Sequence, residues 1–217
     1  TVLMTVQDRA RQTRKPRILC IGMPVRDLIF RVAGVPERGN KDPADGFAEI
    51  AGGNSPNAAI SIARLGGDVL LSGPVGGLNA ASNITIVDQF RGEGIDTGGL
   101  VEVDGVVTPI SSILIDPSGE RTIVTFRDPK LWTVNLPSSD VLLDGCDAIL
   151  AENRCAEFAT DICAEAHRRG IPVVIDADRV MSLREGLLQV SSHIIFSAEA
   201  LRATAGESDE VAALRKV

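Results

Sequence analysis

The chain has 217 residues, of which 44% are hydrophobic and 24% are charged, and this composition is sufficient to bury one sizeable core. Its formal net charge of -7 argues against a nucleic-acid partner, because a protein that binds a polyanion needs a basic face. No apolar run is long enough to span a bilayer, and residues 1–16 lack the apolar core of a signal peptide. We therefore expect a cytoplasmic protein with a small-molecule ligand.

Residues 1–16 are predicted to form a disordered basic tail. This stretch carries Arg9, Arg11, Arg14 and Lys15 among polar residues. Such a composition is more often a solvated tail than an arm that binds nucleic acid. We expect residues 17–217 to form one domain.

Buried strands alternate with helices along this domain. Short apolar runs, typical of strands buried on both faces, occupy residues 17–23, 69–72, 148–151, 173–175 and 193–196. Helical patterns fall between them, at residues 56–65, 84–90, 157–169, 183–190 and 198–205. The alternation predicts an α/β fold with a mostly parallel sheet and helices on its faces.

Two β-rich segments interrupt the alternation, at about residues 28–50 and 101–127. The second contains two hairpin signals, Asp104-Gly105 and Asp116-Pro117-Ser118-Gly119. Strands joined by tight turns do not fit a parallel sheet, so we expect both segments to pair as a small antiparallel sheet. That sheet is either a lid over a ligand site or an addition to the fold with a purely structural role. An isolated small sheet buries little surface, which favours packing on a partner subunit.

The chain ends within a helical pattern. Ser208 is a suitable N-cap, Asp209 and Glu210 favour the first turn, and apolar residues keep helical spacing to Val217. No C-cap follows. We therefore expect the sequence to be a piece of a longer protein.

A glycine-rich turn leads into the first predicted helix. Gly52 and Gly53 allow a ligand or another backbone to approach closely, Pro56 suits the first helical position, and Asn57 places an amide at the helix start. Such a helix start can hold hydroxyls or anionic oxygens. The alternative is an ordinary tight turn.

Asp27 follows the first predicted strand, where the carboxyl ends of parallel strands form the usual ligand crevice. Its carboxylate can accept two hydrogen bonds from vicinal sugar hydroxyls, or it is a surface turn residue. No G-x-x-x-x-G-K-[ST] motif is present, and the first strand leads to Gly-Met-Pro-Val-Arg-Asp instead of G-x-G-x-x-G. P-loop and dinucleotide-binding functions therefore lack their main support.

The four cysteines, Cys20, Cys146, Cys155 and Cys163, form no C-x-x-C pair and lie in or beside apolar segments. This placement favours buried reduced thiols over zinc ligands or disulfides. The 2 histidines lie far apart beside apolar stretches. We therefore expect no metal site in this chain.

Several short patterns occur in one order along the chain. They are Gly22 followed by Asp27, Gly-Gly-x-x-x-Asn at 52–57, Ala-Arg-Leu-Gly at 63–66, Gly-x-Val-Gly at 73–76, Glu-Gly-Ile-Asp at 93–96 and Gly-Glu-Arg-Thr at 119–122. In this order they resemble the landmarks of ribokinase-like, PfkB-type carbohydrate kinases. The resemblance implies a three-layer α/β/α fold with a β lid that closes over a sugar and mediates a homodimer. It also implies that the sugar is bound by Asp27, Gly52, Gly53 and Asn57.

The later part of the chain is closest to sulfofructose kinase-like members of that family, through residues 149–154, 174–178 and 196–201. This similarity implies that Asn153 and Arg154 lie at the far end of the sugar, where a planar guanidinium suits a carboxylate, sulfonate or phosphate. Arg127 is similar to a lid arginine of sugar-acid kinases. The alternative for each arginine is a surface ion pair.

The chain also departs from the family pattern. Leu78 replaces an acidic residue, and Ser197 and Ala200 stand where the family has an Asn-x-x-Glu motif tied to magnesium and phosphate. The family's late Gly-Ala-Gly-Asp, which supplies the anion-binding backbone and the catalytic base, has no counterpart before Val217. We therefore expect the base beyond Val217 and no turnover by this chain alone.

The resemblance thus implies that the complete protein phosphorylates a sugar hydroxyl with ATP and Mg²⁺, and that this chain holds the sugar half of the site. One alternative is a non-catalytic module for sugar binding and dimerisation. Another is a nucleoside kinase of the same fold. The aromatic content of 3% disfavours a nucleoside, because bases stack on aromatic faces.

Overall fold

The structure is a computed structural model that describes residues 14–77 and 81–217. Its strands are β1 (Arg17–Ile21), β2 (Val25–Arg31), β3 (Gly46–Gly52), β4 (Asp68–Gly76), β5 (Asp96–Val103), β6 (Ile110–Ile115), β7 (Arg121–Phe126), β8 (Ala148–Glu152), β9 (Val173–Ala177) and β10 (His193–Phe196). Its α-helices are α2 (Asn54–Arg64), α3 (Ala81–Gly92), α4 (Ser139–Leu142), α5 (Ala156–Arg168), α6 (Gly186–Val190), α7 (Ala198–Ala205) and α8 (Glu210–Lys216). Two short 3-10 helices are η1 (Pro129–Thr133) and η2 (Asn153–Cys155).

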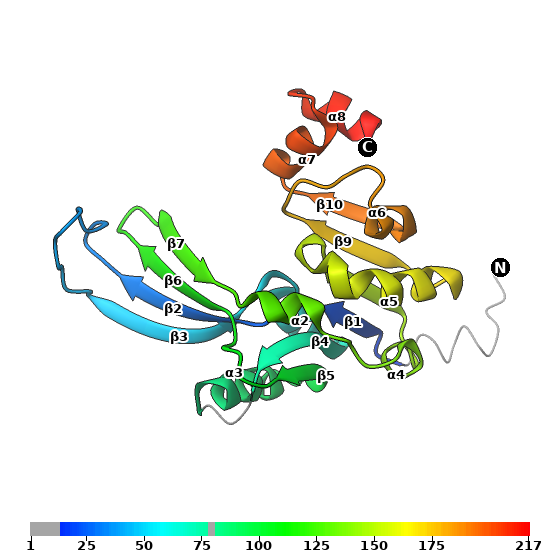
Figure 1. The fold of residues 1–217 in the computed structure, drawn as a ribbon, viewed down its shortest axis with the longest axis horizontal. Helices are drawn as coiled ribbons and strands as arrows, with labels where there is room; N and C mark the ends of the chain where they lie inside the picture. The colour runs from blue at the N-terminus through cyan, green and yellow to red at the C-terminus, as the bar shows by residue number, and fades with distance from the viewer. Residues whose placement is uncertain (1–13, 78–80) are drawn as a thin grey trace, which may run out of the picture.

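Six parallel strands form the main sheet in the order β10-β9-β8-β1-β4-β5 (Figure 1). Strand β1 lies between β4 and β8, and its Leu19, Cys20 and Ile21 are buried. A continuous apolar run suits this position because both faces of the strand are covered. The predicted α/β class with a parallel sheet is confirmed.

Helices cover the two faces of the main sheet. Helix α5 packs on one face, where Phe158 joins a core that includes Leu19. On the other face, Ala59 of α2 and Phe90 of α3 share a second core with Cys20. Neighbouring residues of β1 enter different cores because successive side chains of a strand point to opposite faces. The result is the expected three-layer α/β/α arrangement.

A second, four-stranded sheet in the order β3-β2-β6-β7 projects from the body (Figure 1). Strands β6 and β7 pair antiparallel around a turn in which the Gly119 N–H donates to the Asp116 carbonyl at 3.0 Å, so this predicted hairpin is confirmed. The β2–β3 pair is also antiparallel, but the central β2–β6 pair is parallel. The prediction of a purely antiparallel sheet is therefore wrong, and the sheet is mixed. The β2–β6 pair is parallel because both strands leave the carboxyl edge of the main sheet in the same direction.

Residues 101–103 were predicted to belong to the small sheet, and this prediction is wrong. They form the end of β5, where Val101 pairs with Pro74 and Val103 with Gly76 of β4 in parallel. The Asp104-Gly105 turn therefore ends a strand of the main sheet and makes no hairpin. The other part of the small sheet, β2 with β3, extends a few residues beyond the predicted range of 28–50.

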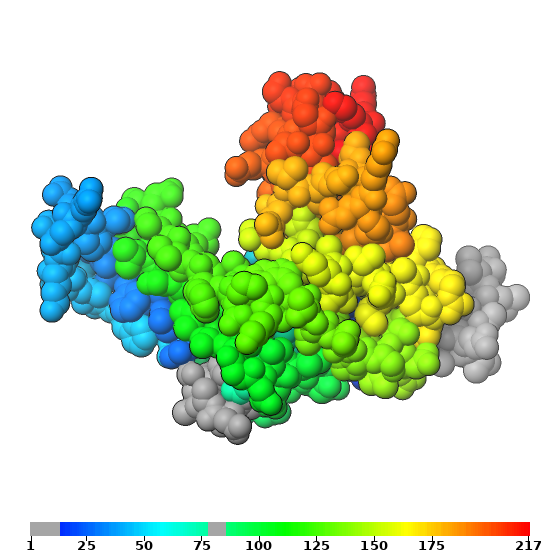
Figure 2. Space-filling model, viewed as in Figure 1, coloured from blue at the N-terminus to red at the C-terminus, as the bar shows by residue number. Residues whose placement is uncertain are grey.

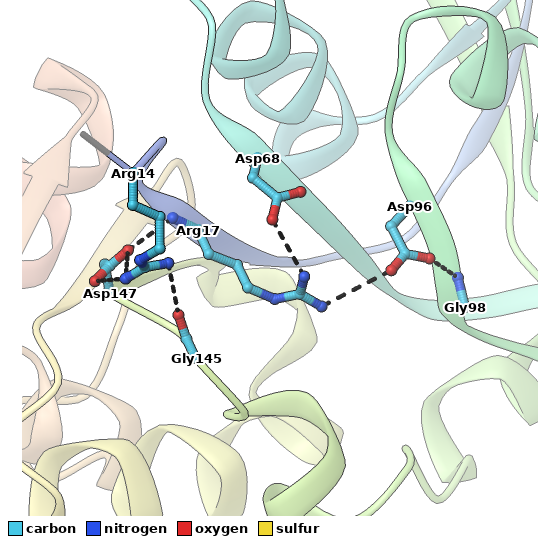
Figure 3. Close-up of polar contacts among 7 residues, drawn as sticks. All are labelled: Arg14, Arg17, Asp68, Asp96, Gly98, Gly145 and Asp147. Atoms are coloured by element: carbon cyan, nitrogen blue, oxygen red, sulfur yellow. Dashed lines mark hydrogen bonds and ion pairs between the residues drawn. The ribbon is translucent and has the colours of Figure 1, made fainter. Parts of the chain in front are cut away.

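Two arginines fix the start of the domain (Figure 3). The Arg14 guanidinium donates to both carboxylate oxygens of Asp147, at 2.6 and 2.8 Å. The Arg17 guanidinium lies 3.2 Å from a carboxylate oxygen of Asp68 and 3.8 Å from one of Asp96, so it links β1 to the starts of β4 and β5. Residues 14–16 therefore belong to the folded domain, which corrects the predicted tail of 1–16. Residues 1–13 of that tail lie outside the described residues.

Helices α7 and α8 pack against each other after β10. Asp209, and not Ser208 as predicted, is the N-cap of α8, because its Oδ1 accepts the Ala212 N–H at 2.8 Å. Both helices project from the body, as the small sheet does, and Figure 2 shows a hollow between the two projections.

Three of the four thiols, those of Cys20, Cys155 and Cys163, are buried as predicted, and that of Cys146 is partly buried. Burial raises the pKa of Cys20 and of Cys163 to about 12, so neither thiol is ionised at neutral pH. Within residues 14–77 and 81–217, no helix combines the length and the apolarity needed to cross a bilayer.

Candidate functional site

The candidate site lies at the carboxyl edge of the main sheet. Strands β1, β8 and β9 end there side by side, because they are adjacent and parallel. The first residues of α2 and the beginning of β2 reach the same edge. Ligands of α/β sheets bind outside the carboxyl ends of the strands, so this edge is the expected place for one.

Glu152, the last residue of β8, is 3% exposed. Its Oε1 accepts the Met23 N–H at 2.8 Å, and the thiol of Cys155 also hydrogen-bonds to the carboxyl group. Burial nevertheless raises the pKa of Glu152 from its ordinary value of 4.5 to about 7. Gly22 is required beside it, because a Cβ at that position would collide with the Glu152 carboxylate.

Asp27 of β2 lies against the glycine pair. A Cβ at Gly52 would collide with the Asp27 carboxylate, and a Cβ at Gly53 would collide with the backbone carbonyl of Met23. Gly53 also has a φ of 110°, a left-handed conformation that glycine adopts without strain. The predicted close approach of another backbone therefore occurs here.

The pKa of Asp27 is raised by its partial burial, while a hydrogen bond from Ser111 and the charge of Arg127 act in the opposite direction. Asp27 pairs directly with Ser111 across β2 and β6, so both side chains lie on one face of the small sheet. The carboxylate is thus placed under the small sheet and is accessible as a hydrogen-bond acceptor.

A cavity of about 30 Å³ lies where these elements meet. It is lined by Met23, Val25, Gly53, Asn54, Arg127, Trp132, Glu152, Arg154 and Cys155. Of the residues predicted for the site, Gly53, Arg127 and Arg154 therefore share one cavity. Asp27 lies near it, since the charge of Arg127 acts on its carboxyl group.

A bidentate ion pair orients the far wall of this cavity. The Arg154 guanidinium donates through Nε to Oδ1 of Asp178 at 3.0 Å and through a terminal nitrogen to Oδ2 at 2.7 Å. The Asn54 amide donates to the same carboxylate at 2.8 Å. The Trp132 indole N–H donates to the Arg154 carbonyl at 3.2 Å. The ends of β8 and β9 are thereby joined to the start of α2 and to η1.

Asn153 does not line the cavity. Its amide nitrogen donates to the Arg179 carbonyl at 2.7 Å, and its buried Oδ1 has no hydrogen-bond partner among the described residues. The side chain therefore ties η2, which follows β8, to the loop that follows β9.

Asn57 lies apart from the other predicted residues. It is exposed on α2 and lines a different cavity, together with Arg64 and Gln89. It lies about one turn further along α2 than Asn54, and it does not line the cavity that contains Asn54 and Gly53. The structure therefore places Asn54, and not Asn57, beside Gly53 in the cavity.

The sequence prediction missed Asn54, Glu152, Asp178 and Trp132. Glu152 and Asp178 could have been found, because each follows an apolar strand directly at the edge where Asp27 was expected. Trp132 carries no such signal, since it lies in the short 3-10 helix η1, whose position depends on tertiary contacts.

Among the described residues, no group of three or more His, Cys, Asp or Glu side chains is arranged to hold a metal ion. Asp178 pairs with Arg154, and one oxygen of Glu152 accepts a backbone N–H. The candidate site is thus built from hydrogen-bonding and cationic groups.

A model of the pfkB family of carbohydrate kinases matches residues 15–217. The chain belongs to the pfkB family.

Known relatives of this pfkB-family chain include fructokinases and ribokinases. Fructokinase-1 of Oryza sativa subsp. japonica is 27% identical over 186 residues, which are 80% of this chain and 53% of the relative. A solved structure from Agrobacterium tumefaciens, assigned as a ribokinase, is 32% identical with a TM-score of 0.85 over 93% of this chain and 65% of that one.

Arabidopsis thaliana ribokinase, solved with ribose and ATP, is 17% identical with a TM-score of 0.78 over 93% of this chain and 68% of that one. At that identity the likeness concerns the fold alone. The pfkB-family chain spans about half the length of the curated relatives it matches.

Proposed function

We propose that the complete protein transfers a phosphoryl group from ATP to a hydroxyl of a sugar, and that this chain holds the sugar. The observation that carries the proposal is the meeting of Asp27, Gly53 and Glu152 at the carboxyl edge of the sheet, beneath the small sheet. Family membership and the named relatives, which are fructokinases and ribokinases, support it.

In this proposal the described residues bind and orient the sugar. Asp27 accepts hydrogen bonds from neighbouring hydroxyls, and Gly53 lets the start of α2 pack against the Met23 carbonyl, which shapes this wall of the site. Glu152 accepts a further hydroxyl when it is ionised and donates when it is protonated. The small sheet limits access of water to the hydroxyl that reacts, which protects the transferred phosphoryl group from hydrolysis.

ATP supplies the phosphoryl group when it is bound, and Mg²⁺ shields the charge of its phosphates. The described residues provide no metal cluster, so no ligand of Mg²⁺ is assigned to them. The role of this chain in the proposal is therefore to place the hydroxyl, since positioning and charge stabilisation together account for most of the catalysis of phosphoryl transfer.

We also propose that the small sheet is the lid over the sugar and that the same sheet forms the interface of a homodimer. Phe47, Val124 and Phe126 are 61%, 72% and 56% exposed. The register of β3-β2-β6-β7 places these three side chains on the face opposite to Asp27. An exposed apolar face of this kind suits a second copy of the chain, since a small sheet alone buries too little surface to be stable.

Sugar-dependent release of ADP by the complete protein tests the kinase proposal. Neutral sugars, anionic sugars and nucleosides are offered with ATP and Mg²⁺, and the phosphorylated product is identified by mass spectrometry. We expect at least one sugar to be phosphorylated and the Asp27→Ala variant to lose most of that activity. Turnover of nucleosides only would favour a nucleoside kinase. Sugar binding without turnover would favour a non-catalytic module.

A further inference from the structure

Three backbone N–H groups are each held by a side-chain acceptor where the small sheet joins the body. The pairs are the Met23 N–H with Glu152 Oε1 at 2.8 Å, the Ala51 N–H with Gln89 Oε1 at 2.8 Å, and the Gly76 N–H with Thr108 Oγ1 at 2.9 Å. They lie at residues 22–24 between β1 and β2, at the end of β3, and at residues 104–109 between β5 and β6. These hydrogen bonds therefore help to hold the small sheet on the body.

Glu152 is the one acceptor of the three that titrates, because the amide of Gln89 and the hydroxyl of Thr108 stay neutral. Its carboxyl group also fits closely against residues 22–24, since a Cβ at Gly22 would collide with it. These three residues, which we call the β1–β2 junction, are the point where the chain passes from the main sheet to the small sheet. A single ionisable side chain thus holds this junction.

No cation contacts the Glu152 carboxyl group in the part of the chain that the structure describes, because Arg154 pairs with Asp178 instead. The charged and titratable groups that face Glu152 are Arg154 and Cys155 of η2, Asp176 and Asp178 at the end of β9, and Arg127 after β7. Burial, with a smaller contribution from the charge of Asp178, raises the pKa of Glu152 to about 7. The group is therefore protonated below this value, and above it a buried carboxylate lacks a counter-charge in contact.

Ionisation of a buried carboxyl group favours any arrangement in which water reaches it. When the β1–β2 junction leaves Glu152, the carboxyl group is hydrated and its pKa returns toward the ordinary value of 4.5. The open arrangement then binds fewer protons than the closed one between these two values. The equilibrium therefore shifts toward opening as the pH rises through this window, by up to about tenfold for each pH unit.

We propose that Glu152 is a pH-sensitive contact between the body and the small sheet, which holds the β1–β2 junction while it carries its proton and releases the junction when the proton is lost. The inference rests on the proposed function only in regarding the small sheet as the cover of the sugar. The site opens more readily at pH 8 than at pH 5, which couples access of the sugar to pH.

Amide hydrogen exchange of the complete protein without sugar measures the opening, because a protected N–H exchanges only when it is exposed. Rates between pH 5 and pH 8 are divided by those of an unstructured peptide, which removes the ordinary acceleration by hydroxide. We expect the corrected exchange of residues 22–31 to accelerate at least tenfold over this range. The acceleration should be the same in low concentrations of urea, since a local opening exposes little surface.

Two variants and a control test the named residue. Glu152→Gln keeps an acceptor for the Met23 N–H but cannot ionise, so its corrected exchange should change less than about twofold between pH 5 and pH 8. Gln89→Ala removes the acceptor of the Ala51 N–H, so exchange at the base of the small sheet should rise by a similar factor at every pH. Asp42→Asn, an exposed carboxylate of the loop between β2 and β3, should behave like the wild type.

The outcomes separate this inference from the proposed function. Corrected exchange that is equal at pH 5 and pH 8 in the wild type overturns the inference, as does a Glu152→Gln variant with the full pH dependence of the wild type. Acceleration that grows with urea in parallel with the exchange of β1 would assign the effect to global unfolding, which also overturns it. None of these results bears on the kinase proposal, because neither sugar nor ATP is present. A protein that opens with pH but phosphorylates no sugar would refute the kinase proposal alone.

Discussion

At the scale of single residues, the candidate site depends on glycines that leave room for carboxylates. Gly22 makes space for Glu152, and Gly52 makes space for Asp27, because a Cβ at either position would overlap the acidic side chain. The two carboxylates can therefore occupy these positions only because Gly22 and Gly52 have no Cβ. A small side chain in place of either glycine would displace the acid without changing any catalytic group.

Gly52→Ala should displace the Asp27 carboxylate and weaken sugar binding by about tenfold, since a hydrogen bond to a charged group contributes roughly that much. Calorimetric titration of the complete protein measures the affinity. Gly46→Ala is the matched control at the other end of β3, where a new Cβ would meet only Arg31 at 3.6 Å or more. Equal affinities of the two variants would contradict the placement of Asp27.

Glu152 should make stability depend on pH. The folded protein holds the Glu152 proton up to a pKa of about 7, whereas the unfolded chain releases it near 4.5. The folded state therefore binds more protons between these values, and the free energy of unfolding falls as the pH rises through this window. Glu152→Gln removes this dependence, so the variant should gain stability relative to the wild type from pH 4.5 to pH 7. Urea unfolding of both proteins at a series of pH values measures the free energy of unfolding. A difference between variant and wild type that stays constant from pH 4.5 to pH 7 would contradict the prediction.

At the scale of elements, β10 and α7 were predicted with the bounds that the structure shows, 193–196 and 198–205. Each has a strong apolar pattern with a capping or boundary residue beside it. Strand β5 was only partly recognised, because it begins with Asp-Thr-Gly-Gly and its pattern is weak until Leu100. The mixed order of the small sheet could not be predicted either, since strand order depends on where distant segments leave the main sheet.

The site was predicted unevenly for a similar reason. Gly52 and Gly53 were singled out because glycine pairs before a helix are a local signal, and Asp27 because it follows a strand. Asn54 was overlooked in favour of Asn57, although both lie at the start of α2, since a motif does not specify which turn of the helix faces the cavity. Trp132 reaches the cavity from η1, which no local pattern indicates.

The elements at the amino edge of the sheet are joined through Asp147. Its carboxylate accepts the backbone N–H of Arg17 at 2.8 Å as well as the Arg14 guanidinium. Asp147→Ala should lower the free energy of unfolding by about 1 kcal/mol, the typical net contribution of such hydrogen bonds. Urea unfolding measures the change. Asp144→Ala, an exposed neighbour in the same turn, should have no effect, and a similar loss in both variants would disprove the specific role of Asp147.

At the scale of the whole molecule, the small sheet has two different faces. Asp27, Ser111 and Thr125 lie on one face, as their direct pairing shows. The opposite face exposes Phe47, Val124 and Phe126. One sheet can therefore close over a ligand with one side and join a second copy with the other, which would couple assembly to substrate access.

Val124→Asp should weaken the proposed dimer at least tenfold, because an uncompensated charge would be buried in an apolar interface. Light scattering after size-exclusion chromatography measures the mass. Thr122→Asp, on the same face of β7 but at an already polar position, is the matched control. A wild-type protein that is monomeric at every concentration would exclude the proposed interface.

The central claim is that this pfkB-family chain holds a sugar through Asp27. Measuring kcat/KM for the phosphorylated sugar with the complete protein tests it most directly, in Asp27→Asn and in Asp42→Asn, an exposed carboxylate of the loop between β2 and β3. Our account predicts that Asp27→Asn lowers kcat/KM by at least a hundredfold, because the carboxylate orients the reacting sugar, and that Asp42→Asn leaves it unchanged. Equal kcat/KM values for Asp27→Asn and the wild type would contradict the claim.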